Sequence, residues 1–347
     1  MSHRRMTVQE LADACGLSRN TVSKVLNSKG NVPETTRQAV LRKAQELGFF
    51  QFVSEAPANP APVRQSIALL TCKIPTDDHF GVRFIPAFAE YLSRAGYTLM
   101  MYGLTENELR GKKLPENIFL EQTAAILGME LFDEGYVKML CSLGLPTLFV
   151  DRYSIANINI MESDWISMEN YASSISIATH LISQGARNIG FVGDPEHCNS
   201  FHERWRSLNY IVQQNGLSMD PSMCICDPDD SPYFDVEWVQ SKLKAMPKLP
   251  DAFFCANDFL AIQVITALKQ MGIAIPQQVM VSGFDGAPQS AVIEPALTTA
   301  EIPVADMGRI AGNALITRIK NPDRAFCCIY VKTTPVFRAS TDRLHKE

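Results

Sequence analysis

The segment from residue 7 to residue 49 constrains the fold most, because it is typical of three short helices separated by two turns. Thr7 and Glu10 have the spacing of a capping box, in which a hydroxyl and a carboxylate satisfy the first amides of a helix. Gly16 is expected to end this helix, and Ser18 is placed to cap the next one. Two helices joined by such a short turn form a helix-turn-helix, whose second helix enters the major groove of DNA.

A third helix is expected after the turn residues 27–31, with Pro33 in its first turn and Gly48 at its end. Each of the last two helices carries an apolar stripe at helical spacing, which predicts a small shared core. These stripes are Val22, Val25 and Leu26, and then Val40, Ala44 and Leu47; in the first helix, Leu11 and Ala14 mark the apolar face.

The charge of this segment differs in sign from that of the remaining chain. Residues 1–50 hold eight basic and four acidic residues, a net charge of +4, whereas all 347 residues carry −5. The other 297 residues therefore carry −9. One small basic module on an acidic protein is typical of a phosphate-binding unit, and the alternative is an ordinary three-helix bundle with solvated lysines.

Length and composition favour two or three globular domains, with 46% apolar and 20% charged residues. No run of about 18 apolar residues is present, and the start MSHRRMTVQEL lacks the apolar stretch of an export signal. The nine scattered cysteines are expected to be reduced, so we predict a cytoplasmic protein. Cys224-Ile-Cys226 and Cys327-Cys328 lack partners at zinc-finger spacing, so neither a metal nor a cofactor is expected.

The domain organisation follows from a shift in composition. Residues 51–65 contain Pro57, Pro60 and Pro62 and predict an extended linker between a domain at 1–50 and a core at 66–342. Within the core, apolar runs of strand length alternate with amphipathic helical stretches, which predicts an α/β fold with doubly wound parallel sheets. The seven runs are 67–70, 97–102, 124–127, 147–150, 189–192, 252–255 and 279–282.

Seven strands separated by helices exceed one compact sheet, so we predict two lobes. The long link 152–167 divides the strands into four and three. Lobe 1 is then placed at about 66–163 and 298–327, and lobe 2 at about 164–297 and 328–342. Polar residues follow several strands, and a ligand of such sheets binds beyond the carboxyl ends of the strands. For each polar residue alone, a solvated loop or a helix cap is the alternative role.

Short motifs occur in a fixed order along nearly the whole chain. Near the start they are Leu11-Ala12, Gly16-Leu17-Ser18, TVSKVLN at 21–27 and ELGF at 46–49; later they are RNIGF at 187–191, AND at 256–258, VSGFD at 281–285 and FRAST at 337–341. Together they resemble the LacI family of bacterial transcription regulators. The resemblance implies a helix-turn-helix headpiece joined to a core like a periplasmic binding protein.

The resemblance also implies a homodimer whose paired headpieces read a roughly palindromic operator in double-stranded DNA. Arg19 and Asn20 fall where the family reads base edges, and their side chains can each hold a purine by two hydrogen bonds. Phosphate contacts are expected from Thr7, Ser18, Thr21, Ser23 and Asn27, and Lys24 is expected at either a base or a phosphate. Helix capping is a second role of Thr7 and Ser18.

A small-molecule effector between the lobes is implied as well. Its expected contacts are Arg204, Asn257 and Asp285, a less uniform one at Asp151, and Asp78, His79 and Phe80 after the first strand. A guanidinium, a carboxamide and carboxylates suit a polyhydroxylated ligand, because each can hold two hydroxyls. Alternative roles are a surface ion pair for Arg204, a turn for Asp285 and an exposed loop for His79. Trp165, Phe201 and Trp205 either stack on a sugar or belong to the core.

The chain departs from the family's pattern at the hinge. Residues 51–57, QFVSEAP, lack the family's Pro-Asn pair, its Arg and the Leu that wedges into the minor groove. We therefore expect an extended linker and no sharp central kink in bound DNA. Gly286 and Ser207 also replace residues that the family often has. The six residues after Thr341 are too few for a leucine-heptad tail, which favours a dimer over a tetramer.

We expect a ligand-responsive, DNA-binding transcription regulator, a repressor, whose operator affinity depends on a sugar or sugar derivative. The alternatives are a nucleoside or nucleobase effector on the same fold, or a cytoplasmic binding protein or enzyme that binds no operator. An enzyme is disfavoured because no G-x-G-x-x-G follows the first strand, where TCKIPTDDHF stands, and no nucleophile motif is present.

Overall fold

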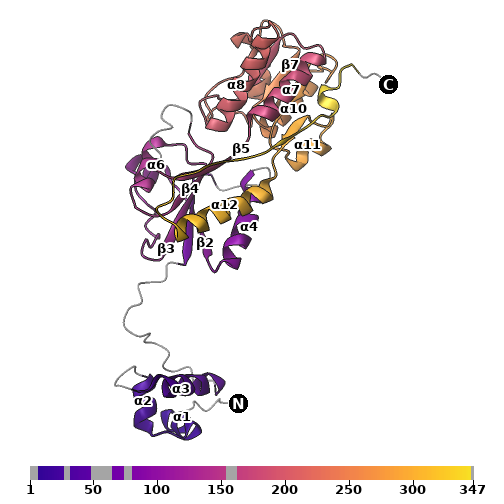
Figure 1. Cartoon of the computed structure of the whole chain (residues 1–347). Helices are drawn as coiled ribbons and strands as arrows, with labels where there is room; N and C mark the ends of the chain where they lie inside the picture. The colour runs from indigo at the N-terminus through magenta and orange to yellow at the C-terminus, as the bar shows by residue number, and fades with distance from the viewer. Residues whose placement is uncertain (1–6, 27–31, 48–64, 74–79, 154–161, 345–347) are drawn as a thin grey trace. The chain divides into compact units, whose positions relative to one another are not determined.

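The computed structural model of the chain describes residues 7–26, 32–47, 65–73, 80–153 and 162–344. They form two compact units, one within residues 1–63, called the headpiece below, and one within 64–347, called the core (Figure 1). The linker expected at 51–65 and its hinge lie outside the described residues, except for Gln65.

The three helices predicted for the headpiece are confirmed: α1 Val8–Cys15, α2 Arg19–Leu26 and α3 Glu34–Glu46. The capping box is formed, since the Thr7 amide donates to Glu10 Oε2 at 2.7 Å and Thr7 Oγ1 accepts from the Glu10 amide. Gly16 ends α1 with φ at +64°, a left-handed conformation that glycine adopts without strain. Ser18 Oγ accepts the Thr21 amide at 3.1 Å and so caps α2.

The headpiece core is largely the predicted one. Its buried members are Leu11, Ala12, Val22, Val25, Leu26, Val40 and Ala44. Two expected members are exposed. Leu47 is 37% exposed because it lies beyond the end of α3, and Ala14 faces solvent because Leu11, Ala12 and Cys15 form the inward stripe of α1.

The core contains two parallel sheets, as predicted. The larger has the order β10-β5-β4-β3-β1-β2 and the smaller the order β6-β7-β8. The strands of the larger sheet are β1 Ser66–Thr71, β2 Thr98–Gly103, β3 Thr123–Met129, β4 Thr147–Val150, β5 Asp164–Met168 and β10 Cys328–Val331. Those of the smaller are β6 Ile189–Val192, β7 Ala252–Cys255 and β8 Met280–Ser282. β3, β4 and β5 are buried along their whole length, because helices cover both faces of a parallel sheet.

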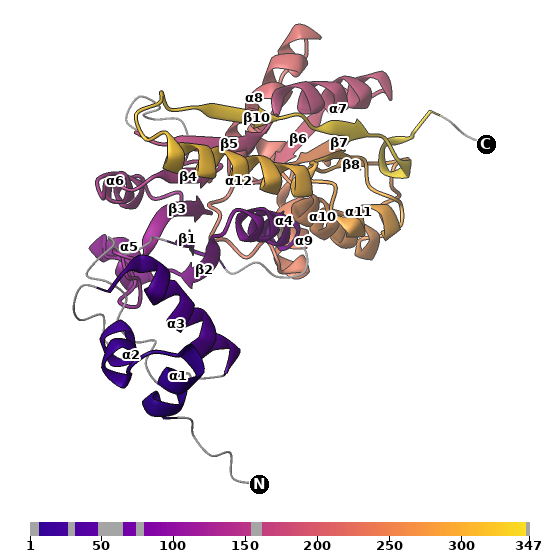
Figure 2. The same ribbon diagram turned by 60° about the horizontal axis from the view of Figure 1, so that its bottom comes forward.

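The helices of the core are α4 Phe80–Arg94, α5 Glu106–Gly111, α6 Glu134–Cys141, α7 Tyr171–Ser183, α8 Asn199–Gln214, α9 Val236–Ala245, α10 Asp258–Gln270, α11 Pro288–Val292 and α12 Val304–Lys320, with short 3₁₀ turns η2 Pro221–Met223 and η3 Ala339–Thr341. In the larger-sheet lobe, α4 and α12 pack side by side (Figure 2). In the other lobe, α7 packs on α8 and α9 on α10. None of the described helices is both long and apolar enough to cross a bilayer.

The lobe boundaries differ from the predicted ones. β5 and β10, placed by sequence in lobe 2, pair in parallel and belong to the larger sheet. β5 was missed because Asp164 and Ser167 interrupt its apolar pattern, although all its residues are buried. Two further short strands, β9 Thr299–Glu301 and β11 Thr334–Val336, pair antiparallel beside β8.

The chain consequently passes between the lobes three times. The connections are residues 169–170 between β5 and α7, 302–303 between β9 and α12, and 332–333 between β10 and β11. The carboxyl ends of β4, β5 and β7 each lead into a polar residue: Asp151, Glu169 and Asn257. This arrangement brings groups from both lobes to one region of the core.

Candidate functional site: the α2 surface and the Arg204 cluster

Helix α2 has one apolar face and one polar face. Val22, Val25 and Leu26 hold it against the headpiece core. Arg19, Asn20 and Lys24, the residues expected at bases, are exposed on its first two turns. A helix that keeps a basic group and an amide free of the core can offer them to base edges.

The residues expected at phosphates differ in their exposure. Thr7 and Ser18 are exposed and act as helix caps, and Ser18 Oγ also lies 2.8 Å from Thr21 Oγ1. Thr21 and Ser23 are half-buried. Asn27 lies outside the described residues.

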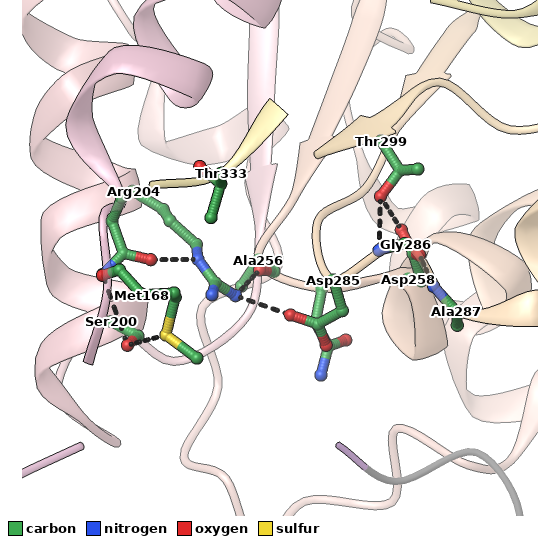
Figure 3. Close-up of polar contacts among 12 residues, drawn as sticks. Met168, Ser200, Arg204, Ala256, Asp258, Asp285, Gly286, Ala287, Thr299 and Thr333 are labelled. Atoms are coloured by element: carbon green, nitrogen blue, oxygen red, sulfur yellow. Dashed lines mark hydrogen bonds and ion pairs between the residues drawn. The ribbon is translucent and has the colours of Figure 1, made fainter. Parts of the chain in front are cut away.

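Arg204 is the centre of the polar cluster in the core. It lies on α8, and its side chain is 2% exposed. Its Nε donates to Asn170 Oδ1 at 3.0 Å, and its Nη1 donates to the carbonyl oxygen of Ala256 at 2.7 Å. Nη1 also lies 3.4 Å from Asp285 Oδ1 (Figure 3). The guanidinium stacks 3.7 Å above the Phe284 ring centre. The alternative of an exposed helix-surface arginine is wrong, because the side chain is enclosed and charge-paired.

Asn170 and Glu203 extend the cluster toward the larger-sheet lobe. Asn170 Nδ2 donates to Glu203 Oε2 at 2.8 Å, and Glu203 Oε1 accepts the Tyr330 hydroxyl at 2.9 Å. Tyr330 belongs to β10, whereas Glu203 belongs to α8, so this chain of hydrogen bonds joins the two lobes. Burial and the nearby Glu203 carboxylate raise the pKa of Tyr330 well above its usual value.

Asp285 and Asp258 form a pair of carboxylates on the other side. Asp285 has φ at +121°, an unusual conformation for a residue other than glycine, and its backbone oxygen accepts Arg83 Nη2 of α4 at 3.3 Å. Asp258 is buried and accepts the Thr299 hydroxyl at 2.6 Å and the Ala287 amide at 2.8 Å (Figure 3). Burial and, secondly, the charge of Asp285 raise the pKa of Asp258 to about 7.

Asn257 is a helix cap. Its Oδ1 accepts the Leu260 amide at 2.9 Å, at the start of α10. The helix-cap role, which the sequence left open as an alternative, is therefore present. Because the oxygen is used in this way, a contact with an effector would fall to the Nδ2 amide group.

Asp151 lies next to a second polar residue, Asn199. Asp151 follows β4 with φ at +59°, and burial raises its pKa. Its Oδ1, and both side-chain polar atoms of the 1%-exposed Asn199, are buried without a hydrogen-bond partner among the described residues. The backbone amide of Asn199 donates to the carbonyl of Arg152, the residue after Asp151, at 2.9 Å, so Asn199 and Asp151 are neighbours. Unsatisfied buried polar groups cost about 1–3 kcal/mol each, and a polar ligand would satisfy them.

The remaining expected effector residues are less informative. Asp78 and His79 lie outside the described residues. Phe80 is half-buried at the start of α4 and stacks on Phe84, with ring centres 5.5 Å apart, as part of the apolar core. A surface hollow of about 490 Å³ elsewhere in the core, at Lys269 to Ile275, is lined by none of the predicted residues.

Trp165 is buried against Tyr330, edge to face at 5.1 Å, which favours its role in the core. Phe201 and Trp205 are partly buried and pack against the main core cluster. Phe201 also lies 5.9 Å from the Arg204 guanidinium, so its ring borders the polar cluster.

Sequence reasoning missed four residues of the cluster: Asn170, Asn199, Ser200 and Glu203. Ser200 precedes Arg204 by four residues on α8, so its helical spacing was a usable signal. Asn170 had no comparable signal, because β5, which places it, was not predicted.

Comparisons with known proteins agree with this architecture. The family model for bacterial regulatory proteins of the lacI family matches residues 7–51, and the model for a periplasmic binding protein-like domain matches residues 178–341. The first covers the three-helix headpiece, and the second covers most of the smaller-sheet lobe together with α12 and β10.

Curated relatives match over nearly full length. The HTH-type transcriptional regulator reg1 of Streptomyces lividans is 28% identical over 321 residues, 89% of each chain. The ribose operon repressor of Haemophilus influenzae is 24% identical, over 96% of this chain and 98% of the relative.

Solved structures share the fold. The Lac repressor dimer bound to operator and the anti-inducer ONPF has a TM-score of 0.73 at 19% identity, over 97% of this chain and 99% of that one. A complex of the transcriptional regulator CelR with cellobiose has a TM-score of 0.70 at 22% identity, over 97% and 100%.

A helix-turn-helix headpiece carried by a two-lobed core of the periplasmic-binding-protein type defines a class of bacterial regulatory proteins. Within that class, this chain has the DNA-binding domain of the lacI family joined to a periplasmic binding protein-like domain, and its near full-length relatives are named as transcriptional regulators and repressors.

Proposed function

We propose that this chain binds operator DNA as a homodimer through α2 and that an effector held beside Arg204 controls the operator affinity, as in a repressor. The observation that carries the proposal is the polar cluster around Arg204, in which Arg204 bonds Asn170 on a lobe crossing and Glu203 accepts the Tyr330 hydroxyl of the other lobe, in a chain that also has an exposed polar face on α2. An effector that binds one lobe arrangement better than another shifts the population toward it, and couplings of this kind are typically about 1–3 kcal/mol.

The chemistry of the cluster favours a polyhydroxylated effector, a sugar or sugar derivative. Asp151 Oδ1 and the side-chain amide of Asn199 offer acceptors and donors whose partners a ligand's hydroxyls could supply. Two relatives support this class by their names: the ribose operon repressor and the CelR–cellobiose complex.

A nucleoside or nucleobase is the second candidate, because aromatic rings line up near Arg204. Phe132 of the larger-sheet lobe lies 4.9 Å from the His197 ring, and His197 lies 5.2 Å from Phe201. These rings meet edge to face or tilted, and the face of one ring beside the cluster could stack on a flat base. The repressor PurR of Haemophilus influenzae is a relative at 24% identity.

A second copy of the chain would cover strand β2, which ends the larger sheet. Met100 and Met101 are 45% and 48% exposed there, on opposite faces of the strand. An exposed apolar edge strand is a surface for pairing with another chain.

Because the relatives are named as regulators, we propose binding rather than catalysis as the role of the Arg204 cluster.

The test combines two measurements on the full chain. Operator sites are first selected from genomic fragments at low salt, and affinity is then measured with and without sugars, sugar phosphates and nucleosides. The same compounds are screened by thermal shift, because a ligand of the folded state raises the melting temperature. One compound should both raise the melting temperature and change operator affinity. Failure to retain any fragment at low salt would contradict the proposal.

A further inference from the structure

The segment Cys224–Ile225–Cys226 presents two thiols on one side of an extended backbone. Cys224 has φ −109° and ψ 154°, and Ile225 is 1% exposed and bridged to Val192 of β6. Side chains alternate along extended backbone, so both cysteines lie on the side opposite the buried Ile225. Cys226 is exposed and Cys224 half-buried.

The two thiols are close enough for each to shift the pKa of the other, and Cys224 Sγ also lies 3.5 Å from the Asp220 carbonyl oxygen. The Phe191 amide also donates to Cys224 Sγ at 3.3 Å. The neighbouring Cys226 thiol and, to a smaller extent, the Phe191 amide lower the pKa of Cys224 to about 7, whereas the neighbouring Cys224 raises the pKa of Cys226. At neutral pH a substantial share of Cys224 is therefore the thiolate, the form that binds metals and metalloids.

The backbone disfavours a disulfide here. The Ile225 amide donates to Phe191 O, and its carbonyl accepts from the Gly193 amide, both at 2.9 Å. These bonds hold the segment extended, where Cα atoms two residues apart are roughly 6.6 Å apart. A disulfide prefers about 5.5–6 Å and has an upper limit of about 6.8 Å. One soft atom placed between the two sulfurs would join them without shortening the backbone.

We propose that Cys224 and Cys226 form a two-thiol binding site for a soft, thiophilic ligand, a trivalent metalloid or a soft metal ion. Soft thiolates select such ligands over hard cations. With a trivalent arsenical of the type R–As=O, two S–As bonds form, the two thiol protons and the arsenical oxygen leave as water, and no atom is oxidised. The site is separate from the Arg204 cluster and does not depend on the proposed function.

The chain contains a matched control pair at Cys327 and Cys328. Cys328 is the first residue of β10, and Cys327 directly precedes it with its carbonyl accepting the Trp165 amide at 3.0 Å, so alternation directs the two side chains to opposite faces. Cys327 Sγ accepts a hydrogen bond from Arg324 Nη2 at 2.6 Å, so its partner is an arginine and not Cys328. Two cysteines that are neighbours in sequence are therefore not enough to form a two-thiol site. The one-residue gap between Cys224 and Cys226 distinguishes the first pair.

The test uses the reduced full chain and phenylarsine oxide as the probe. Native mass spectrometry should show one bound phenylarsenic group that excess glutathione leaves in place and dithiothreitol removes. C224S and C226S should lose this glutathione-resistant adduct, while C327S and C328S keep it. Circular dichroism checks that each variant is folded, and the exposed Cys226 is the safer position. A resistant adduct that persists in both C224S and C226S, or a Cys224–Cys226 disulfide already present in the aerobically purified chain, would overturn the proposal.

Discussion

Arg204 Nη1 lies 3.4 Å from Asp285 Oδ1, although the two residues are 81 positions apart in the chain. The same guanidinium donates through Nε to Asn170, on a connection between the lobes. Arg204 thus ties α8 both to the turn after β8 and to a lobe crossing (Figure 3). A ligand that competes for Asp285 or Arg204 would act on groups that hold the lobes together.

Replacing Asp285 with Asn should remove most of the effector response and leave the fold intact. Arg204 keeps its bonds to Asn170 and Ala256, whereas the charge that a ligand hydroxyl or amine would use is lost. The melting-temperature shift caused by the active compound should disappear. The control is Asp306→Asn, in an exposed ion pair with Arg309, which should keep the full shift. An unchanged shift in Asp285→Asn would exclude Asp285 as an effector contact.

Arg318→Met should destabilise the core by about 3–5 kcal/mol, since it leaves Asp164 as an uncompensated buried charge. Both side chains of this pair are 3% exposed, and two 2.9 Å bonds join them. Urea unfolding measures the loss of the free energy of unfolding. Arg309→Ala, at the exposed pair with Asp306, should cost less than about 1 kcal/mol. Similar costs for the two variants would show that the buried pair adds no special stability.

Asp258 should make the core less stable as pH rises from about 4 to about 7. Burial and the charge of Asp285 raise its pKa from 3.8 to about 7, so in this window the folded chain retains a proton that the unfolded chain has released. The folded state binds more protons there, and the free energy of unfolding falls with increasing pH, by an amount on the order of 2–4 kcal/mol.

The Asp258→Asn variant isolates this effect, because other titrating groups are shared. Its deficit in unfolding free energy relative to the parent chain should shrink between pH 5 and pH 8. Asp285→Asn removes one cause of the shift and should move the transition to lower pH. A deficit that is the same at both pH values would refute a raised pKa at Asp258.

If α2 reads bases through Arg19, Arg19→Ala and Lys24→Ala should change operator binding in different ways. Arg19→Ala should cost about 1–3 kcal/mol on the preferred operator and relax discrimination at one base pair. If Lys24 contacts a phosphate, Lys24→Ala should weaken all sequences alike and lower the salt slope by about 1. Gln38→Ala, exposed on α3, should change neither. Anisotropy titrations over several salt concentrations measure both quantities.

Much of the fold was predictable because its signals are local. The helix-turn-helix followed from Thr7, Gly16 and Ser18, whose caps depend on residues at most a few positions away. All seven strands predicted from apolar runs are present within two residues of their predicted ends. β5 was not predicted, because Asp164 looks polar in sequence and becomes buried only through its pairing with Arg318, 154 positions later.

The candidate site was predictable in part. Arg204 and Asp285 were assigned together from the resemblance, and the structure brings them into contact. Asn257 was assigned as an effector contact, but its oxygen serves as a helix cap. Asn199 was not assigned, since nothing in its neighbourhood in the sequence shows that burial leaves its amide without a partner among the described residues.

The amino-acid sequence by itself determined most of the elements, their order and the basic exposed face of α2, because turns, caps and apolar periodicity act over one or two helical turns. Only the tertiary structure decided which strands share a sheet, where the chain crosses between lobes and which polar groups meet at Arg204. These depend on packing between segments tens of residues apart, where burial and not local pattern sets the energy of each charge and hydrogen bond.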